Sequence, residues 1–252
     1  MILGAQLYTL RNEMKTPEEI DIGLKAVAEM GYTTVQVSGI GKIDAGLLRE
    51  ICDKYKLQIV ITHISADRLL FDTQNVIEEH KILGCSLVGI GSMPDKYRGS
   101  VKGCEQFISD YKPIAEQFAL SGMTFMYHNH NFELEHFNGK TILEMLAKGF
   151  DKDIMGFTLD TYWIQNAGGD PEEYLEYLTS RVPVVHLKDM VYQNHEVIMA
   201  PVGEGNMNWQ RITKACEKAG TKFLLVEQDT CIENPFICLK KSFDNLSCLG
   251  YK

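Results

Sequence analysis

Short runs of apolar residues alternate along the chain with segments in which apolar residues recur every three or four positions. The runs are rich in β-branched and aromatic residues, which is typical of strands, and the other segments have the spacing of helices that bury one face. We predict eight strands, at residues 2–8, 33–39, 58–65, 86–92, 123–129, 154–162, 182–189 and 222–229. A strand followed by a helix, repeated along the chain, indicates a parallel sheet.

The helical segments carry start and stop signals at their ends. Residues 17–31 have apolar side chains at helical spacing and end in Gly31, while residues 44–57 begin with Asp44, a good cap. Eight strand–helix units fill 252 residues with little surplus. We therefore predict an α/β protein with a single (β/α)8 TIM barrel domain over residues 1–252.

One stretch, at about residues 190–207, has no regular pattern. It follows the seventh predicted strand, and it is the longest irregular segment of the chain. Loops that follow the strands of such a barrel carry much of its chemistry. We expect this stretch to be an irregular active-site loop.

Composition and charge narrow the class of protein. The chain has 25 Lys and Arg against 34 Asp and Glu, and its longest basic run is Lys240-Lys241, which argues against a groove for nucleic acid. The first residues lack the pattern of a signal peptide, and no apolar run approaches the roughly 18 residues of a membrane helix. Seven cysteines without C-x-x-C spacing suggest reduced thiols. We expect a cytoplasmic protein that binds neither nucleic acid nor membrane.

Polar residues follow the apolar runs of several predicted strands, at the barrel end where chemistry gathers. These residues are Gln6, His63, His128, Asp160, His186, Lys188, Asp189 and Glu227. One such residue alone is usually a hydrogen-bonded structural group. Ionisable groups brought together from strands five to eight would lose solvation and repel, so a bound cation is the simplest way to reconcile them. Two carboxylates with histidine suit one divalent ion such as Mn²⁺, Mg²⁺, Co²⁺ or Zn²⁺.

The motifs and their order make the chain resemble the xylose isomerase-like barrels, which include sugar phosphate isomerases and epimerases, inosose dehydratases and 3-dehydroshikimate dehydratases. The resemblance runs through GAQLYTLR, YHNHNFE, LDTYW, VVHLKDM, PVGEGNMNW and LLVEQD, and so covers nearly the whole chain. It implies one divalent metal ion held by residues at the ends of strands five to eight. The last three ligands carry over onto Asp160, His186 and Glu227.

Strand five departs from the family pattern, because it ends in His128 where many relatives have Glu. The nearest carboxylate, Glu133, stands five residues further on. We take Glu133 as the fourth metal ligand and His128 as a substrate contact. The reverse assignment stays open, because in some dehydratases of the group a catalytic His lies two residues beyond the strand-five ligand, and His130 stands two beyond His128.

The resemblance implies a divalent-metal-dependent sugar isomerase or epimerase that removes a proton next to the carbonyl of a ketose or keto-sugar through a metal-stabilised enediolate. We expect the catalytic residues to be Glu133, Glu227, His130 and Lys188. We expect substrate contacts from His63, His128, Gln6 and Trp163. For Lys188, a structural ion pair with Asp189 or Glu227 is the alternative.

We weigh three other functions, of which the last, an endonuclease, is disfavoured by a net charge of −9 and only seven His. The same constellation can expel a hydroxyl, which would make the protein a dehydratase of a keto-polyol such as an inosose. A non-catalytic sugar-binding protein is a second alternative, since fold does not fix function. An endonuclease for abasic DNA sites shares this barrel but needs three zinc ions and a basic surface. The expected partner is a small sugar or keto-polyol, and since many such barrels are oligomers, a homo-oligomer is also an expectation.

Overall fold

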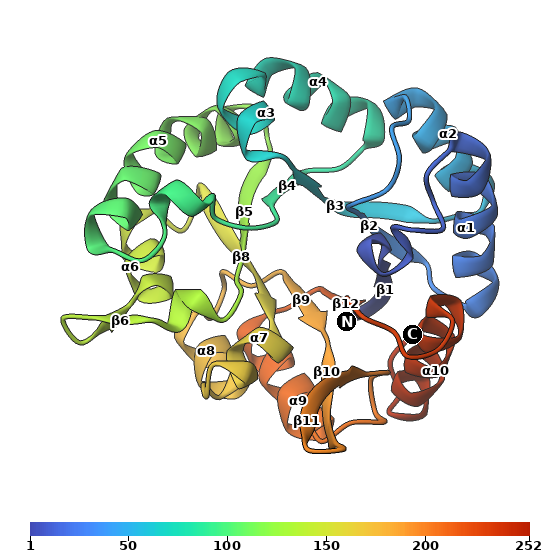
Figure 1. Ribbon diagram of the computed structural model, residues 1–252. Helices are drawn as coiled ribbons and strands as arrows, with labels where there is room; N and C mark the ends of the chain where they lie inside the picture. The colour runs from blue at the N-terminus through green and yellow to red at the C-terminus, as the bar shows by residue number, and fades with distance from the viewer.

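The computed structural model describes residues 1–252, which form a closed barrel of eight parallel strands surrounded by helices (Figure 1). The barrel strands are β1 (Ile2–Gln6), β2 (Thr34–Val37), β3 (Gln58–Ile64), β4 (Leu87–Ile90), β5 (Thr124–His128), β8 (Met155–Asp160), β9 (Val184–Leu187) and β12 (Phe223–Val226). They pair in this order, and β12 closes on β1. The predicted (β/α)8 barrel is confirmed, and all eight predicted strands are present, each somewhat shorter than predicted.

Helices follow the strands and cover the outside of the barrel. They are α1 (Pro17–Met30), α2 (Ala45–Lys54), α3 (Ala66–Phe71), α4 (Thr73–Leu83), α5 (Val101–Leu120), α6 (Ile142–Gly149), α7 (Thr161–Asn166), α8 (Pro171–Tyr177), α9 (Trp209–Ala219) and α10 (Pro235–Cys248). Three short 3₁₀ helices, η1 (Leu7–Leu10), η2 (Asp95–Tyr97) and η3 (Phe132–Leu134), lie in the connections. No helix combines the length and the apolar character needed to span a membrane.

The predicted end signals of α1 and α2 are confirmed. Thr16 and Glu19 form a reciprocal capping box at the start of α1, and Gly31 ends that helix with φ of 111°, a conformation that side chains disfavour. The carboxylate of Asp44 accepts the backbone N–H groups of Gly46 and Leu47 at the start of α2. Local sequence therefore fixes where these helices begin.

The stretch after β9 is not irregular, so that prediction was wrong. It forms an antiparallel hairpin of β10 (Asp189–Gln193) and β11 (Glu196–Ala200). Asn194 and His195 make the turn with φ of 51° and 66°. Two consecutive residues in this conformation are typical of tight hairpin turns, which usually contain glycine, and its absence here hid the turn from sequence reasoning. A second hairpin, of β6 (His136–Phe137) and β7 (Lys140–Thr141), was not predicted either.

Asp189 ties the chain that follows this hairpin to the end of β9. Its carboxylate accepts the backbone N–H groups of Gly203 at 2.9 Å and Gly205 at 3.1 Å, and the indole N–H of Trp209 at 2.6 Å. A Cβ on Gly205 would lie 2.2 Å from an oxygen of Asp189, so the loop needs glycine there. Of the two ion-pair partners considered for Lys188, Asp189 is wrong because N–H donors saturate its carboxylate, whereas Glu227 does pair with Lys188, at 2.9 Å.

The inside of the barrel is layered because alternate residues of a strand point to the same face. Ile61, Met126, Val184 and Leu225 form an apolar cluster with Val60. Each of the first four lies two residues before a polar residue of the predicted site, namely His63, His128, His186 and Glu227. The apolar cluster is thus the layer on which the polar residues rest.

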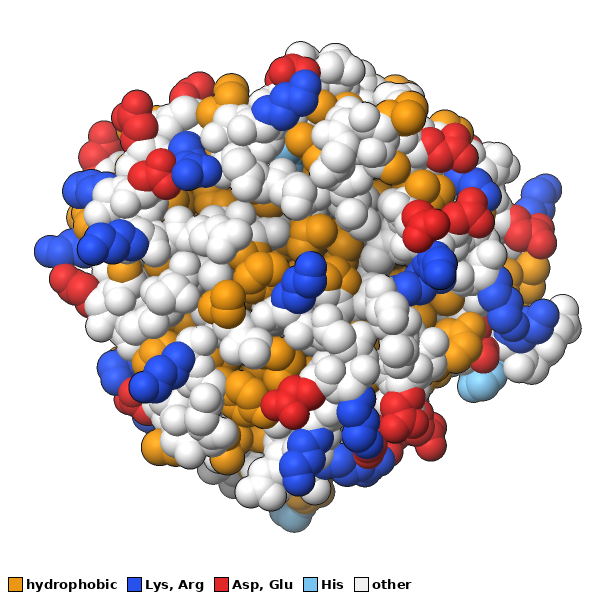
Figure 2. All heavy atoms as spheres, turned by 180° about the vertical axis from the view of Figure 1, so that it is seen from behind, with side chains coloured by type: hydrophobic (Ala, Val, Ile, Leu, Met, Phe, Trp, Pro, Cys, Tyr) orange, Lys and Arg blue, Asp and Glu red, His pale blue; other side chains and the backbone are white.

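The outer surface carries charges of both signs. On the face turned away from the viewer of Figure 1, Lys and Arg alternate with Asp and Glu around the rim, and apolar side chains lie nearer the centre (Figure 2). This face therefore shows no broad field of one sign.

Candidate metal centre and pocket

Four buried side chains from four neighbouring barrel strands converge at one point. They are His128 of β5, Asp160 of β8, His186 of β9 and Glu227, which directly follows β12. One ligand atom of each lies within 4.8 Å of all the others. All four follow strand residues that point into the barrel, so the fold itself aims them at a common centre.

Hydrogen bonds on the far side of each imidazole fix which nitrogen faces this centre. His186 Nε2 lies 2.7 Å from Gln36 Oε1, and His128 Nδ1 lies 2.9 Å from the carbonyl oxygen of Gly91. Because both partners are oxygens that only accept, these nitrogens carry the hydrogen in the neutral imidazole. The other nitrogens, His186 Nδ1 and His128 Nε2, then present lone pairs to the centre, as metal-binding histidines do.

In the neutral tautomers, these lone pairs face carboxylate oxygens. Burial would lower the pKa of His186, but the charges of Glu227 and Asp160 raise it, so a cation at this place is favoured. His186 Nδ1 is 3.0 Å from Glu227 Oε2, and His128 Nε2 is 3.3 Å from Asp160 Oδ2. His186 Nδ1 is buried without a well-aligned hydrogen-bond partner, and Glu227 Oε2 has only ion-pair contacts. Four acceptors facing one another in a buried place fit a divalent cation, and the mixed N/O set suits several transition metals. The residues present could therefore hold the metal ion that the sequence implied.

Lys188 supplies a positive charge beside this group. Its ammonium nitrogen lies 2.9 Å from both Asp160 Oδ2 and Glu227 Oε2, and 3.1 Å from Asp229. Burial alone would lower the pKa of Lys188, but the three carboxylates outweigh it and raise the pKa. Burial would likewise raise the pKa of Asp160 and of Glu227, yet the charge of Lys188 holds both below their ordinary values. The cluster is thus ionised, with Lys188 as its built-in counter-ion.

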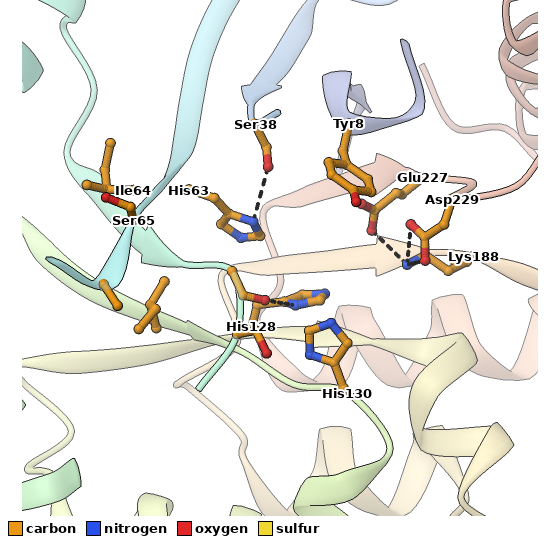
Figure 3. A pocket seen from close by; sticks show the side chains of 14 residues that line it. Tyr8, Ser38, His63, Ile64, Ser65, His128, His130, Lys188, Glu227 and Asp229 are labelled. Carbon is orange, nitrogen blue, oxygen red and sulfur yellow. Dashed lines mark hydrogen bonds and ion pairs between the residues drawn. The ribbon is translucent and has the colours of Figure 1, made fainter. Parts of the chain in front are cut away.

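The centre opens into a pocket of about 470 Å³, within the range of small-molecule sites. Its lining is mostly polar, and it includes Tyr8, Ser38, His63, Ser65, Ser92, His128, His130, Lys188, Glu227 and Asp229. Figure 3 shows the imidazoles of His63, His128 and His130 on one side, and Lys188, Glu227 and Asp229 on the other. We name these two sides the imidazole wall and the charged wall.

The imidazole wall contains nitrogens without partners. His63 Nε2 and His130 Nδ1 are both buried and unpaired. Burial, with a smaller contribution from the neighbouring imidazole of His128, lowers the pKa of His63 well below its usual range and that of His130 to about 3. Both rings are therefore neutral, with polar nitrogens free for a ligand.

The structure does not bring Glu133 into the cluster, and it brings His128 there instead. Glu133 is fully buried, with its carboxylate accepting the hydroxyl of Tyr127 at 2.6 Å and the backbone N–H of His130 at 2.8 Å. Burial raises its pKa to about 7, although these hydrogen bonds oppose the shift. The 3₁₀ turn η3 carries Glu133 behind the strand, where it supports the chain at His130 and does not reach the pocket.

Two expected substrate contacts also lie outside the pocket lining. Gln6 is buried, and its side-chain oxygen accepts the backbone N–H of Tyr8. The ring centroid of Trp163 lies 5.5 Å from that of His130 and 5.5 Å from the nitrogen of Lys188. Gln6 therefore orders the turn that carries Tyr8, and Trp163 packs near two pocket residues, His130 and Lys188.

Sequence reasoning missed two residues that complete the site. Gln36 holds His186 in its tautomer, and Asp229 binds Lys188 with both carboxylate oxygens at 3.1 Å. A polar residue inside the apolar run TVQV could have drawn attention to Gln36. Asp229 stands two residues beyond Glu227, so strand periodicity could have placed it on the same side.

Comparison with known proteins agrees with this architecture. Residues 24–235 match the family model described as xylose isomerase-like TIM barrel. A sugar phosphate isomerase/epimerase from Parabacteroides distasonis superposes with a TM-score of 0.83 at 23% identity, covering 97% of this chain and 92% of the other. No curated protein gives a significant match.

Two further solved structures show the range of named activities on this fold. A probable 3-DHS dehydratase from Bacillus anthracis superposes with a TM-score of 0.75 at 15% identity, covering 98% of this chain and 99% of the other. A D-allulose 3-epimerase from Methylomonas sp. has a TM-score of 0.75 at 12% identity, with coverages of 98% and 97%. At these identities the likeness establishes the fold.

Proposed function

We propose that this chain, which belongs to the xylose isomerase-like TIM barrel family, is a divalent-metal-dependent sugar epimerase or isomerase. The observation that carries the proposal is the convergence of two imidazole lone pairs and two carboxylates at the floor of a polar pocket. The named activities of similar structures, sugar phosphate isomerase/epimerase and D-allulose 3-epimerase, support the same reaction type.

We assign the metal ligands to His128, Asp160, His186 and Glu227. His128 replaces Glu133 in this set because its lone pair faces the other three ligands while Glu133 is engaged elsewhere. When bound, a divalent cation supplies Lewis acidity toward a carbonyl oxygen. Gln36 and the carbonyl of Gly91 hold the two imidazoles in the required tautomer.

The proton steps fall to groups on opposite walls of the pocket. The carboxylate of Glu227 accepts the proton from the carbon next to the carbonyl, and the electron pair of that C–H bond becomes the C=C bond of an enediolate. The neutral ring of His130, across the pocket in Figure 3, relays a solvent proton to the other face of the same carbon, since one ring nitrogen gives up its hydrogen as the other accepts one from water. Protons taken and given on opposite faces invert the carbon, which is epimerisation. Proton exchange with solvent then returns Glu227 to its ionised form and His130 to its starting tautomer.

Lys188 and Asp229 act on the charge that develops at oxygen. The ammonium group of Lys188 lines the pocket and is held in place by Asp160, Glu227 and Asp229. The ammonium group keeps its three carboxylate partners, and its fixed positive charge still favours the negative charge that develops on a nearby substrate oxygen. Asp229, the most exposed of its three partners, keeps the ammonium turned toward the pocket.

Dehydration of a keto-polyol is the second candidate function. Lys188 could protonate a leaving hydroxyl on the carbon beyond the enediolate, and the similar structure named as a probable 3-DHS dehydratase supports this reading. The same ligands and the same first proton transfer serve both reactions. The products distinguish them, because epimerisation conserves the substrate formula and dehydration releases water.

Metal content and proton exchange test the proposal together. We expect about one transition-metal ion per chain after loading with Mn²⁺, and its loss in Asp160→Ala and in His128→Ala. The Mn²⁺-loaded protein should exchange the proton next to the carbonyl of a ketose in D₂O, as followed by NMR, and the chelated protein should not. A protein that binds no Mn²⁺, Co²⁺ or Zn²⁺ would contradict the proposal.

A further inference from the structure

We infer that the substrate of this site is an uncharged polyhydroxy carbonyl compound, and not a phosphate ester or a carboxylic acid. The inference rests on the proposed function for the location of the site, and it adds the charge of the molecule that enters it. Two sets of observations carry it: the pocket has no free cation, and its unpaired polar atoms suit hydroxyl groups.

Lys188 is the only Lys or Arg that lines the pocket, and its ammonium group is already paired with carboxylates of the protein. It lies within 3.1 Å of three carboxylates, those of Asp160, Glu227 and Asp229. An anionic substrate would have to compete with all three for the same ammonium group. Lys188 is therefore the counter-ion of the protein itself and not a receptor for a phosphate.

Two arginines that contact pocket-lining residues are also engaged. Arg11 donates to the carbonyl oxygens of Tyr8 and Asp229, and its guanidinium packs 4.2 Å from the ring centroid of Tyr8. Arg98 donates to the carbonyl of Met93 and the hydroxyl of Ser92, and it pairs with Asp95. Neither guanidinium lines the pocket. The pocket therefore offers a phosphate group no free Lys or Arg side chain.

The formal charge of the site also opposes an anion. Asp160, Glu227 and Asp229 contribute three negative charges and Lys188 one positive charge, so the group sums to −2. A divalent cation brings this sum to zero. A phosphate ester would restore two negative charges in a half-enclosed space, where like charges repel strongly. Such repulsion is a common means of excluding a wrong ligand.

Neutral hydroxyl groups, in contrast, match what the imidazole wall offers. His63 Nε2 and His130 Nδ1 are buried, unpaired and on pocket-lining rings, and the hydroxyls of Ser38, Ser65 and Tyr8 lie around them. Buried polar atoms normally have partners, so those without one point to a ligand that completes them. A sugar hydroxyl both donates and accepts, and so it can satisfy either tautomer of a neutral ring.

Two glycines, one in β4 and one directly after it, leave space for the imidazole of His63. A Cβ on Gly89 would lie 2.8 Å from Cδ2 of His63, and a Cβ on Gly91 would lie 3.0 Å from Nδ1. Both glycines therefore admit the imidazole of His63 to the pocket. This close fit holds Nε2 in one position, which suits the recognition of a single hydroxyl.

Matched pairs of probes test the inference directly. Saturation-transfer NMR on the Mn²⁺-loaded protein would compare D-fructose and D-tagatose with their terminal phosphate esters. We expect the free sugars to bind at least about tenfold more tightly than the esters, because like-charge contacts cost several kcal/mol. His63→Gln should weaken the free sugars about tenfold, and the exposed His195→Gln should not.

A second variant tests whether the negative charge of the charged wall disfavours phosphate esters. Asp229→Asn removes one negative charge from the charged wall, and it should narrow the preference for free sugars over esters by about tenfold. Asp153→Asn, which changes an exposed carboxylate, is the matched control and should leave the preference unchanged. An unaltered preference in Asp229→Asn would contradict the role of charge.

The outcomes separate this inference from the proposed function. Free sugars that bind selectively but exchange no deuterium would support the inference and contradict the epimerase. Phosphate esters that bind as tightly as free sugars, or exchange deuterium faster, would overturn the inference while leaving the epimerase standing. Absence of binding by every free sugar tested would also overturn it.

Discussion

The two walls of the pocket satisfy their polar atoms in different ways. On the charged wall, the ammonium of Lys188 contacts three carboxylates within 3.1 Å. On the imidazole wall, His63 and His130 each keep a buried nitrogen without a partner. The ammonium group of the charged wall thus has its partners without a ligand, and its ion pairs are built into the protein. The two free nitrogens of the imidazole wall, in contrast, can gain partners only from a ligand.

This difference predicts that substitutions on the charged wall strongly reduce turnover or folding stability. Substitutions of residues behind the imidazole wall should have smaller effects. The largest effect is expected at Glu227. Replacement by Gln removes the proposed base and one metal ligand, so the rate of ketose deuterium exchange should fall by about a thousandfold or more. Exchange rates measured beside Glu196→Gln, an exposed control, would check this, and near-normal exchange in Glu227→Gln would refute the assignment.

Lys188→Met should have the next largest effect, on stability. It leaves the buried carboxylates of Asp160 and Glu227 without their counter-ion, and breaking such a group costs about 3–5 kcal/mol. Denaturant unfolding without metal should show a loss of this size, and Mn²⁺ should restore more stability to the variant than to the wild type. The exposed Lys214→Met is the control. Equal stability of wild type and variant without metal would show that the carboxylates find other compensation.

Glu133 gives a pH-dependent effect behind the imidazole wall. Burial raises its pKa from 4.5 to about 7, so the protonated form is favoured in the folded state. Its contribution to stability is therefore fully present below about pH 4.5 and is lost as the pH rises through about 7. Glu133→Gln stays neutral, so its stability relative to wild type should rise over this interval by on the order of 3 kcal/mol.

Urea unfolding at several pH values would measure this difference, with Glu135→Gln as the exposed control. A constant difference between wild type and Glu133→Gln from acidic to neutral pH would mean that the Tyr127 and His130 hydrogen bonds keep the carboxylate ionised.

The smallest effect is expected at Gln36, which supports the metal centre from the opposite side of His186. Gln36→Leu removes the acceptor at 2.7 Å from His186 Nε2 and leaves the four ligands in place. Loss of such a supporting contact typically costs about 10–100-fold in metal affinity. Competition with a fluorescent chelator would measure it, beside the exposed Gln106→Leu. Unchanged affinity would mean that packing alone orients the imidazole.

The barrel and three of the four converging residues could be predicted from the sequence for a simple reason. Asp160, His186 and Glu227 each end an apolar run, and the alternation of a strand fixes the side on which such a residue lies. The choice between His128 and Glu133 could not be made, because it depends on η3, a turn of three residues that carries Glu133 out of the pocket. Gln36 and Asp229 act through partners distant in sequence, which no local pattern reveals.

The hairpin after β9 has a consequence for how chains with this barrel can vary in sequence. The chain leaves the barrel at Asp189, runs out through β10 and β11, and returns to the same carboxylate at Gly203 and Gly205. Both ends of the hairpin segment are therefore held by the carboxylate of Asp189, the residue that follows Lys188. We expect insertions or substitutions at the Asn194–His195 turn to leave both ends of the hairpin in place. The length and sequence of this hairpin are therefore free to vary with little constraint from the residues at the barrel end.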